Sequence, residues 1–477
     1  MIGITNTNMT NQKRIHFIGI CGVAMSALAI SFQKNGWTVS GSDVGFFPPI
    51  SDHLKKHKIY FYPGWHPEKM MKNGKPDIVV VGNVAGSTNP ELFAARENGL
   101  NYKSYPEIVA EYIVQDHSLV CAGTYGKTTS AALLAWILSR AGMDPTYMFG
   151  GLSLNIPESA EIRKNNVRSG WSVLEGDEYK TARWDDRPKF KLYSPTHLLL
   201  TAATWDHADV FPTEKSYLQA FRDLIKMIPK KGLIMACKDG ENVNKLIDEA
   251  NCKVLTYGKN DADYTYKKIK QTKDGIAFTV EDGEKEYTVK AQVLGVHMVE
   301  NICGCFAMAK EIGIDENKII KAISEFNGIR RRLEKRGKGK IAIYDDLAHS
   351  PTKAKASLKT LRTIYPESKI IAVFEPNTGN RRPQSAAGYA NAFTDADEIL
   401  IPSLTKIKTD PNDTESPFDE KQLADIISQT HPKTKYIEDD KKLLNYILEN
   451  TKKEDVVVFL GSHGFRGMIE DLVKNNS

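Results

Sequence analysis

The stretch Ser-Leu-Val-Cys-Ala-Gly-Thr-Tyr-Gly-Lys-Thr-Thr, residues 118–129, decides the fold of the central part of this chain. Residues 118–122 predict a short buried strand, and the glycine-containing loop 123–129 follows it directly. Good helix formers occupy 131–141, and Gly142 is typical of the residue just beyond a helix end. A strand, a glycine loop and a helix in this order predict a parallel α/β domain that binds a nucleotide.

The Gly-Lys-Thr-Thr part of the loop predicts phosphate binding. Backbone N–H groups of such a loop surround a polyphosphate, Lys127 reaches its β- and γ-phosphates, and the Thr128 hydroxyl ligates Mg²⁺. The loop is a shortened P-loop, because Cys121 stands where the full pattern has its first glycine. The alternative is a tight strand-to-helix turn with a solvated lysine. The expected ATP-binding residues here are Gly123, Thr124, Gly126, Lys127, Thr128 and Thr129.

The N-terminal part has its own β-α-β pattern. A strand at 14–18 enters a Gly-Ile-Cys-Gly turn, and a helix at 24–33 leads to a second strand at 37–40, with Asp43 just past its end. We expect the third strand at 77–81 and a helix at 89–98. The dinucleotide pattern lacks two of its three glycines, at Cys21 and Ala24, which argues against NAD. Gly22 then either binds a diphosphate or forms a structural turn.

The whole chain is predicted to form three α/β domains, with breaks near 115 and 330. These are a Rossmann-like N-terminal domain (1–115), a P-loop ATPase-like central domain with a parallel sheet (116–329) and a Rossmann-like C-terminal domain (330–477). The further strands expected are 171–175, 197–201, 232–235, 341–344, 369–374, 398–401 and 456–460, with helices at 214–228 and 297–312 and a small β region at 262–294.

Two acidic clusters follow strands of the central domain. Glu175, Asp177 and Glu178 come after the strand at 171–175, and Asp206, His207 and Asp209 come after the strand at 197–201. Ligands of α/β proteins bind at the carboxyl ends of the strands, and a Mg²⁺ site needs one or two rigidly held carboxylates beside phosphate. Glu175, at its strand end, is the best placed. The alternative for both clusters is solvated loop charge.

The last third holds a basic and an acidic cluster. Residues 330–332 are three arginines, which form either a solvated hinge or a cation supplied to a transferring phosphoryl group. Asp345, Asp346 and His349 follow the strand at 341–344. Gly-x-Ser-x-Gly is absent, so a Ser–His–Asp hydrolase is not supported.

Composition and charge exclude several classes of protein. The 64 basic and 59 acidic residues give a net charge of +5 without a long basic run, so a nucleic-acid partner is not expected. No apolar run approaches the ~18 residues of a membrane span, and the polar start is unlike a secretory signal. Six scattered cysteines without a metal-ligand spacing indicate reduced thiols in a cytoplasmic protein.

These motifs occur in an order that resembles the Mur ligases, the ATP-dependent amide ligases of peptidoglycan assembly. The order is Gly-Ile-x-Gly, Gly-Thr-x-Gly-Lys-Thr-Thr, Glu-x-Asp-Glu, Asp-His, Arg-Arg-Leu-Glu and Asp-Asp-x-x-His, and the resemblance covers residues 14–470. Segments 177–190 and 206–211 most resemble the family branch that recycles murein peptides. The resemblance implies a ligase that joins UDP-N-acetylmuramate to L-Ala-γ-D-Glu-meso-diaminopimelate through an acyl phosphate, acting as a monomer or weak homo-oligomer.

The resemblance also implies roles for particular residues. Lys127 would bind phosphate, Thr128 and Glu175 would bind Mg²⁺, and His207 would hold a second metal. The remaining implied positions are Asn301 at adenine, Arg332, Asp346 and His349 at the nucleotide, and Gly19, Gly22, Ser42 and Asp43 at the UDP-sugar.

The chain departs from the family pattern at several positions. Cys21 and Ala24 replace glycines, Met298 replaces an asparagine and Ser350 replaces a histidine. Asn377 stands where the recycling branch tends to have arginine. Two alternatives therefore stay open: a ligase that adds free L-alanine, and a non-catalytic UDP-sugar sensor.

Overall fold

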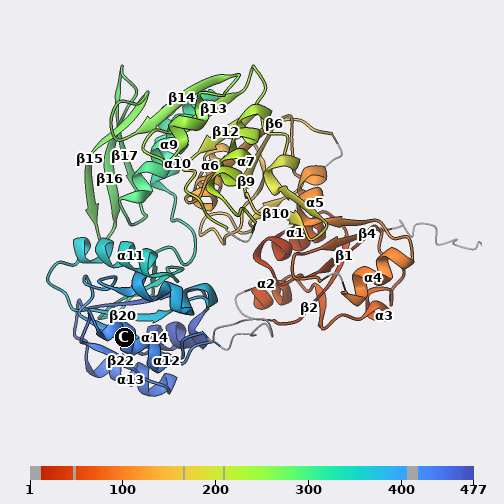
Figure 1. The fold of residues 1–477 in the computed structure, drawn as a ribbon. Coiled ribbons are helices and arrows are strands. Elements are labelled where there is room, and N and C mark those ends of the chain that lie inside the picture. The colour runs from red at the N-terminus through yellow and green to blue at the C-terminus, as the bar shows by residue number, and fades with distance from the viewer. Residues whose placement is uncertain are drawn as a thin grey trace, which may run out of the picture. The chain divides into compact units, whose positions relative to one another are not determined.

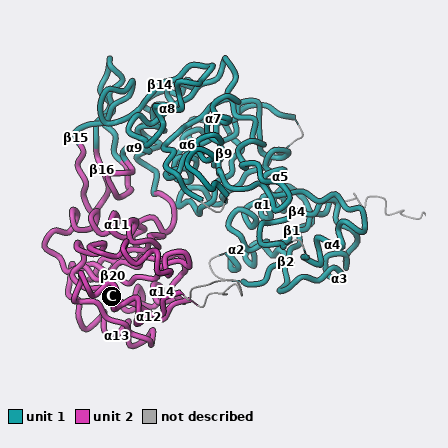
Figure 2. The backbone as a smooth tube through the Cα atoms, in the orientation of Figure 1, with its two compact units in different colours: residues 1–268, 278–290, 299–327 teal, residues 269–277, 291–298, 328–477 magenta. Residues whose placement is uncertain are grey.

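The computed structural model describes residues 12–46, 50–86, 88–164, 167–207, 210–405 and 417–476. Three main sheets are present, as Figure 1 shows, and the chain divides into two compact units (Figure 2). Unit 1 comprises residues 1–268, 278–290 and 299–327, and unit 2 comprises 269–277, 291–298 and 328–477. Predicted domain boundaries near 115 and 329 stay a prediction. Within the described residues, no helix is both long and apolar enough to cross a bilayer.

The first sheet has five parallel strands in the order β3-β2-β1-β4-β5. Its elements are β1 (Arg14–Ile18), α1 (Val23–Lys34), β2 (Thr38–Asp43), α2 (Ile50–Lys56), β3 (Tyr60–Pro63), α3 (Pro67–Met70), β4 (Ile78–Val81), α4 (Pro90–Glu97), β5 (Tyr102–Ser104) and α5 (Tyr105–Tyr112). The strand expected third is thus the fourth, because the four-residue edge strand β3 has too short an apolar pattern to be recognised. Asp43 ends β2 rather than following it.

The second sheet has ten strands in the order β17-β16-β15-β14-β13-β12-β6-β9-β7-β8. Its elements up to β12 are β6 (His117–Ala122), α6 (Lys127–Arg140), β7 (Thr146–Met148), β8 (Ala160–Glu161), β9 (Trp171–Gly176) and β12 (His197–Leu200), with a separate hairpin β10 (Lys180–Ala182) and β11 (Asp185–Pro188) and a 3-10 turn η1 (Lys189–Leu192). The later elements are α7 (Glu214–Met227), β13 (Leu233–Cys237), α8 (Val243–Ile247), β14 (Lys253–Gly258), β15 (Tyr264–Thr272), β16 (Gly275–Glu281), β17 (Glu286–Ala291), α9 (His297–Glu311) and α10 (Glu316–Ser324).

One hydrophobic core joins the first sheet to the second within unit 1. Apolar side chains from β1 and α1, such as Phe17 and Phe32, belong to the same buried cluster as Leu198 of β12 and Phe221 of α7. Burial of this surface stabilises both sheets together, at roughly 25 cal/mol per Å² of apolar area. This shared core explains why two predicted α/β regions form one compact unit.

The third sheet lies in unit 2, with six strands in the order β18-β19-β23-β20-β21-β22. All neighbours are parallel except β18 and β19. Its elements are β18 (Glu334–Arg336), β19 (Ala342–Asp346), α11 (Pro351–Ile364), β20 (Ile370–Glu375), η2 (Thr378–Arg381), η3 (Pro383–Tyr389), β21 (Glu398–Ile401), α12 (Glu420–Ser428), β22 (Thr434–Tyr436), α13 (Asp440–Glu449), β23 (Val456–Gly461), η4 (Phe465–Gly467) and α14 (Met468–Asn475). The α/β class predicted for the C-terminal third is confirmed.

Candidate active site

The glycine loop between β6 and α6 has a backbone that only glycine tolerates at two positions. Gly123 has φ +132° and Gly126 has φ +81°, both in the left-handed region. A Cβ at Gly123 would fall on the Thr201 hydroxyl, and one at Gly126 on the Asn301 side-chain oxygen. α6 begins at Lys127, four residues earlier than predicted. The β-branched residues after Lys127 have low helix propensity, so propensity alone does not include them in the helix.

The N-terminus of α6 is suited to an anion. The helix has 14 residues, and its N-cap residue, Gly126, has no side chain to accept hydrogen bonds from the first turn. First-turn N–H groups and the helix dipole therefore favour a phosphate at this end. Neighbouring hydroxyl groups stabilise the loop: the Thr124 hydroxyl donates to the Thr204 carbonyl at 2.8 Å, and Thr129 is buried.

Lys127 forms a buried ion pair with Glu178. Its Nζ lies 2.9 and 3.1 Å from the two Glu178 carboxylate oxygens, and Glu178 is fully buried. Burial alone would lower the pKa of Lys127, but the carboxylates of Glu178, Asp177 and Glu175 together outweigh it and raise that pKa. Burial also raises the pKa of Glu178, against the attraction of Lys127. The Tyr217 hydroxyl also donates to Glu178, at 3.4 Å. Lys127 is thus held in its charged form at the mouth of the glycine loop.

The two predicted Mg²⁺ ligands are in direct contact. The Thr128 hydroxyl donates to the Glu175 carboxylate at 2.7 Å, and the other Glu175 oxygen accepts from the Gly150 N–H at 2.6 Å. Hydroxyl and carboxylate oxygens are the hard donors that Mg²⁺ prefers, so this pair fits the ion. The metal-binding role of both residues stays a prediction.

His207 also lies close to the Glu178 carboxylate. Its Nε2 is 3.6 Å from a Glu178 oxygen, and its backbone has φ +56°, a strained value for a residue with a side chain. Asp206 lies beside it, with an oxygen 4.0 Å from the same Nε2. Asp209, named with it in the sequence cluster, falls outside the described residues.

Sheet order explains how these side chains meet. β12, β6 and β9 are neighbours, with Cys121 paired to Glu175 and Ala122 paired to Leu200. The glycine loop and the two acidic clusters therefore emerge at one carboxyl edge of the sheet. Sequence reasoning singled out Glu175 and gave Glu178 no role. Only the full burial of Glu178 and its contacts to Lys127 and His207 reveal it as the centre of the cluster.

The loop after β1 is tied to the end of β2. The Gly19 N–H donates to the Ser42 carbonyl, and the Cys21 N–H donates to the Asp43 carboxylate, both at 2.8 Å. The Ser42 side chain is fully buried, and its hydroxyl donates to the buried Glu91. Gly22 caps α1 with φ −64°, which any residue adopts. UDP-sugar binding by Gly19, Gly22, Ser42 and Asp43 stays a prediction, and the Ser42 hydroxyl has a structural partner.

In unit 2, Asp346 and His349 have opposite pKa shifts with the same main cause. Burial raises the pKa of Asp346 to about 6, although the Ser357 hydroxyl donates to it. Burial lowers the pKa of His349 to about 4, and the nearby Lys353 lowers it further. Among described atoms, His349 Nδ1 is buried without a hydrogen-bond partner. Both pKa values are therefore displaced from their ordinary range, a feature that is typical of functional sites.

The three consecutive arginines have different surroundings. Arg331 donates to Asp345 at 3.1 Å and to three backbone carbonyls at 461–463, so it holds β18, β19 and the end of β23 together. Arg330 pairs with Glu334 at 3.5 Å, and Arg332 is exposed. Among the residues that the structure describes, Arg332 has no comparable hydrogen bonds, and its nucleotide-binding role stays a prediction.

Comparisons with known proteins cover almost the whole chain. Profiles described as Mur ligase family, catalytic domain, as Mur ligase middle domain, and as Mur ligase, glutamate ligase domain match residues 14–117, 121–309 and 331–463.

Individual relatives agree with these matches. UDP-N-acetylmuramate–L-alanyl-γ-D-glutamyl-meso-2,6-diaminoheptandioate ligase of Escherichia coli is 30% identical over 96% of this chain and 97% of its own length. UDP-N-acetylmuramate–L-alanine ligase of Clostridium botulinum is also 30% identical, over 94% of this chain and 95% of its own. The crystal structure of the alanine ligase MurC of Thermotoga maritima shares the fold, with a TM-score of 0.77, 23% identity and coverage of 97% and 98%. The chain therefore belongs to the Mur ligase family, whose members are ATP-dependent amide ligases.

Proposed function

We propose that this chain joins the carboxylate of UDP-N-acetylmuramate to the amine of L-Ala-γ-D-Glu-meso-diaminopimelate, with ATP as the energy source. The observation that carries a phosphoryl-transfer function is the cluster at the carboxyl edge of β12, β6 and β9. At this edge a glycine loop, a charged lysine, a carboxylate–hydroxyl pair and a histidine lie next to one another. Such substrates are cytoplasmic metabolites, so we place the activity in the cytoplasm.

The residues of the cluster have distinct tasks in this proposal. The glycine loop and the first turn of α6 bind the phosphates through N–H groups, and Lys127 neutralises the charge that develops on the transferred group. Glu178 holds Lys127 in place before ATP binds. Thr128 and Glu175 would hold Mg²⁺, which supplies charge neutralisation at the β- and γ-phosphates.

The chemistry follows from the weakness of a carboxylate as an electrophile. The carboxylate oxygen attacks the γ-phosphorus of ATP, the bond to ADP breaks, and an acyl phosphate forms. The amine of the acceptor then attacks the carbonyl carbon, and phosphate leaves as the amide forms and the amine loses a proton. Exclusion of water protects the acyl phosphate from hydrolysis.

The choice of the tripeptide rests on the segment after β9. Residues 177–190 resemble the recycling branch, and they form the hairpin β10–β11. Arg183 of this hairpin donates to the Asn83 carbonyl, just after β4, at 3.1 Å, and Trp184 packs edge-on against Tyr102. The hairpin therefore bridges the first sheet and the nucleotide site. Addition of L-alanine is the second candidate, because the alanine ligase is equally similar in sequence.

Phosphate release tests the proposal. Purified protein is assayed with ATP, Mg²⁺ and UDP-N-acetylmuramate, and either the tripeptide or L-alanine is added. We expect turnover with the tripeptide and none with Lys127→Ala. Turnover with L-alanine alone would replace the first candidate with the second, and no turnover with either acceptor would refute both candidate reactions.

A further inference from the structure

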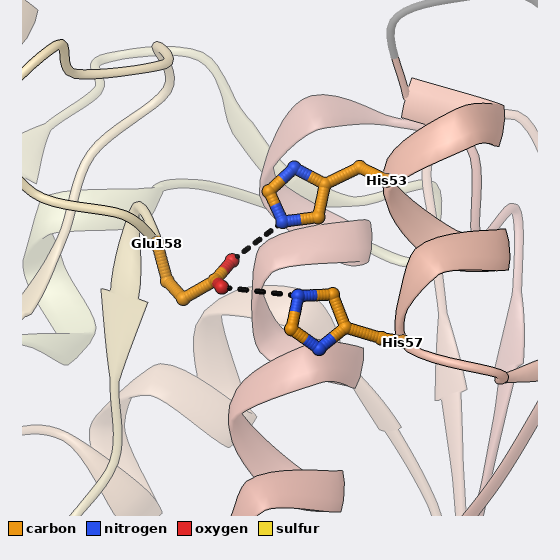
Figure 3. A group of neighbouring side chains, drawn as sticks. All are labelled: His53, His57 and Glu158. Carbon is orange, nitrogen blue, oxygen red and sulfur yellow. Dashed lines mark ion pairs between the residues drawn. The ribbon is translucent and has the colours of Figure 1, made fainter.

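A second cluster of chemically active side chains lies far from the glycine loop in the sequence. His53 of α2 and His57, the residue just after this helix, are linked by a hydrogen bond from the His57 N–H to the His53 carbonyl, and both rings point at Glu158, which precedes β8 (Figure 3). His53 Nε2 lies 2.9 Å from one Glu158 oxygen, and His57 Nε2 lies 3.2 Å from the other. The two rings are stacked, with centroids 5.1 Å apart. Three possible ligand atoms therefore lie within 4.8 Å of one another.

The burial of this group suits a bound ion that solvent can still reach. Glu158 is only 6% exposed, whereas the side chains of His53 and His57 are 25% and 20% exposed. Both imidazoles present Nε2 to the same carboxylate, so the two nitrogen atoms and the carboxylate oxygens already face one point.

One cation already contacts the carboxylate. Lys34 of α1 donates to Glu158 at 2.8 Å, and the Lys34 side chain is 41% exposed. The Lys34 side chain is partly exposed, so its ammonium group can be hydrated when a metal ion takes its place at Glu158. Its charge opposes a second cation at Glu158, so Lys34 should weaken metal binding without preventing it.

We propose that His53, His57 and Glu158 bind one divalent transition-metal ion of the Zn²⁺ class. Two imidazole nitrogens and one carboxylate oxygen form a typical three-ligand set for Zn²⁺, with water as the fourth ligand. The imidazoles favour Zn²⁺, Ni²⁺ or Co²⁺ over Mg²⁺ and Ca²⁺, which prefer oxygen. The two histidines are four residues apart and both already face Glu158, so they need no large backbone movement to bind the same ion.

The site would join the two sheets of unit 1. α2 belongs to the first sheet region and Glu158 to the segment before the edge strand β8 of the second. Residue 162 is already attached to α1, since the Ile162 N–H donates to the Ser31 hydroxyl at 3.0 Å. A bound ion would add a cross-link beside this contact and stabilise unit 1.

Zinc titration of the purified full chain tests the site. The measurement is binding of Zn²⁺ against a colorimetric chelator in excess Mg²⁺, together with the thermal unfolding midpoint. We expect one Zn²⁺ with a raised midpoint, and at least ~100-fold weaker binding in His53→Gln, His57→Gln and Glu158→Gln, since even partners of metal ligands change affinity about 10–100-fold. Lys34→Met should bind Zn²⁺ roughly threefold or more tightly.

Two controls separate this site from other zinc-binding groups. His66 forms a single exposed pair with Glu68 at 3.2 Å, so His66→Gln should leave zinc binding unchanged. His207→Gln should also leave it unchanged, because that histidine belongs to the nucleotide cluster. Wild-type binding in the three ligand variants would overturn the proposal, as would loss of the tight Zn²⁺ in His207→Gln. No binding by the wild-type chain and no gain in Lys34→Met would show an ion-pair cluster only.

Discussion

Replacement of Glu178 by glutamine tests how much the buried ion pair at the glycine loop contributes to stability. Glu178 is fully buried and the Lys127 side chain is 13% exposed, with Nζ 2.9 Å from the nearer carboxylate oxygen. Glu178→Gln leaves the Lys127 charge without its partner. Loss of one member of a buried pair costs about 3–5 kcal/mol of unfolding free energy, and the partial exposure of Lys127 places the expected loss at the lower end.

The double variant Lys127→Met/Glu178→Gln separates charge from packing. Because it removes both charges and nearly keeps the volumes, its unfolding free energy should recover by about 1–3 kcal/mol relative to Glu178→Gln. The double variant should release no phosphate in the ligase assay, because the lysine charge at the glycine loop is gone. Lys164→Met is the matched control: Lys164 and Asp144 form a highly exposed pair at 3.5 Å, worth at most about 1 kcal/mol.

Chemical denaturation of the four proteins provides the measurement, monitored by circular dichroism, with phosphate release assayed in parallel. A loss below about 1 kcal/mol in Glu178→Gln would refute the assignment of a strongly coupled buried pair. A double variant no more stable than Glu178→Gln would show that packing of the glutamate, rather than its charge, stabilises the site.

The remaining predictions concern the glycine loop and unit 2. Gly126→Ala places a residue with a Cβ in the left-handed conformation and against Asn301, at a cost of about 1–2 kcal/mol. The KM for ATP should therefore rise roughly tenfold, and an unchanged KM would contradict phosphate binding by the glycine loop. Between about pH 4 and 6, the raised pKa of Asp346 means that the native state holds a proton that the unfolded state has lost, so this group lowers the unfolding free energy as pH rises. His349 has a lowered pKa, so the unfolded state holds its proton in this range and the group raises the unfolding free energy as pH rises. Denaturation across this range should show a steeper rise with pH in Asp346→Asn and a flatter or falling profile in His349→Gln, and identical profiles would contradict both shifts. Ser350 accepts from the Lys353 N–H as the N-cap of α11, so Ser350→Ala should cost about 0.5–2 kcal/mol of unfolding free energy, measured by the same denaturation.

Local patterns predict those parts of the site that a few neighbouring residues determine. The Gly-Lys-Thr-Thr loop is one, because Gly126 and the start of α6 depend on backbone conformation within a single turn. Ser350 is another: it departs from the family histidine, yet a serine before a proline-initiated helix is a good N-cap. Helix propensity alone predicts a helix start at 131, because the β-branched threonines at 128 and 129 are poor helix formers. The glycine loop nevertheless gives these residues a helical backbone, so α6 begins at Lys127.

Contacts between distant segments escape this kind of reasoning. Nothing near Glu178 in the sequence distinguishes it from Asp177, yet Glu178 pairs with Lys127 while Asp177 pairs with Lys189. The segment after β9 reaches the glycine loop because β9 lies beside β6 in the sheet, an order that depends on the whole topology. Glu158 is likewise about 100 positions away from His53 and His57, and none of the three belongs to a motif that the sequence analysis recognises.

The two clusters of unit 1 differ in how they satisfy a buried carboxylate, and the difference indicates their functions. Glu178 accepts from Lys127 of the glycine loop, and if that loop binds phosphate as we propose, the phosphate competes with the carboxylate for the same cation. Glu158 has two imidazoles and one partly exposed lysine around it, so an arriving metal competes with Lys34 for the carboxylate and gains the two imidazole nitrogens as further ligands. The first arrangement releases a cation to a substrate, as phosphoryl transfer requires. The second gains a cation and becomes more rigid, as a structural site requires.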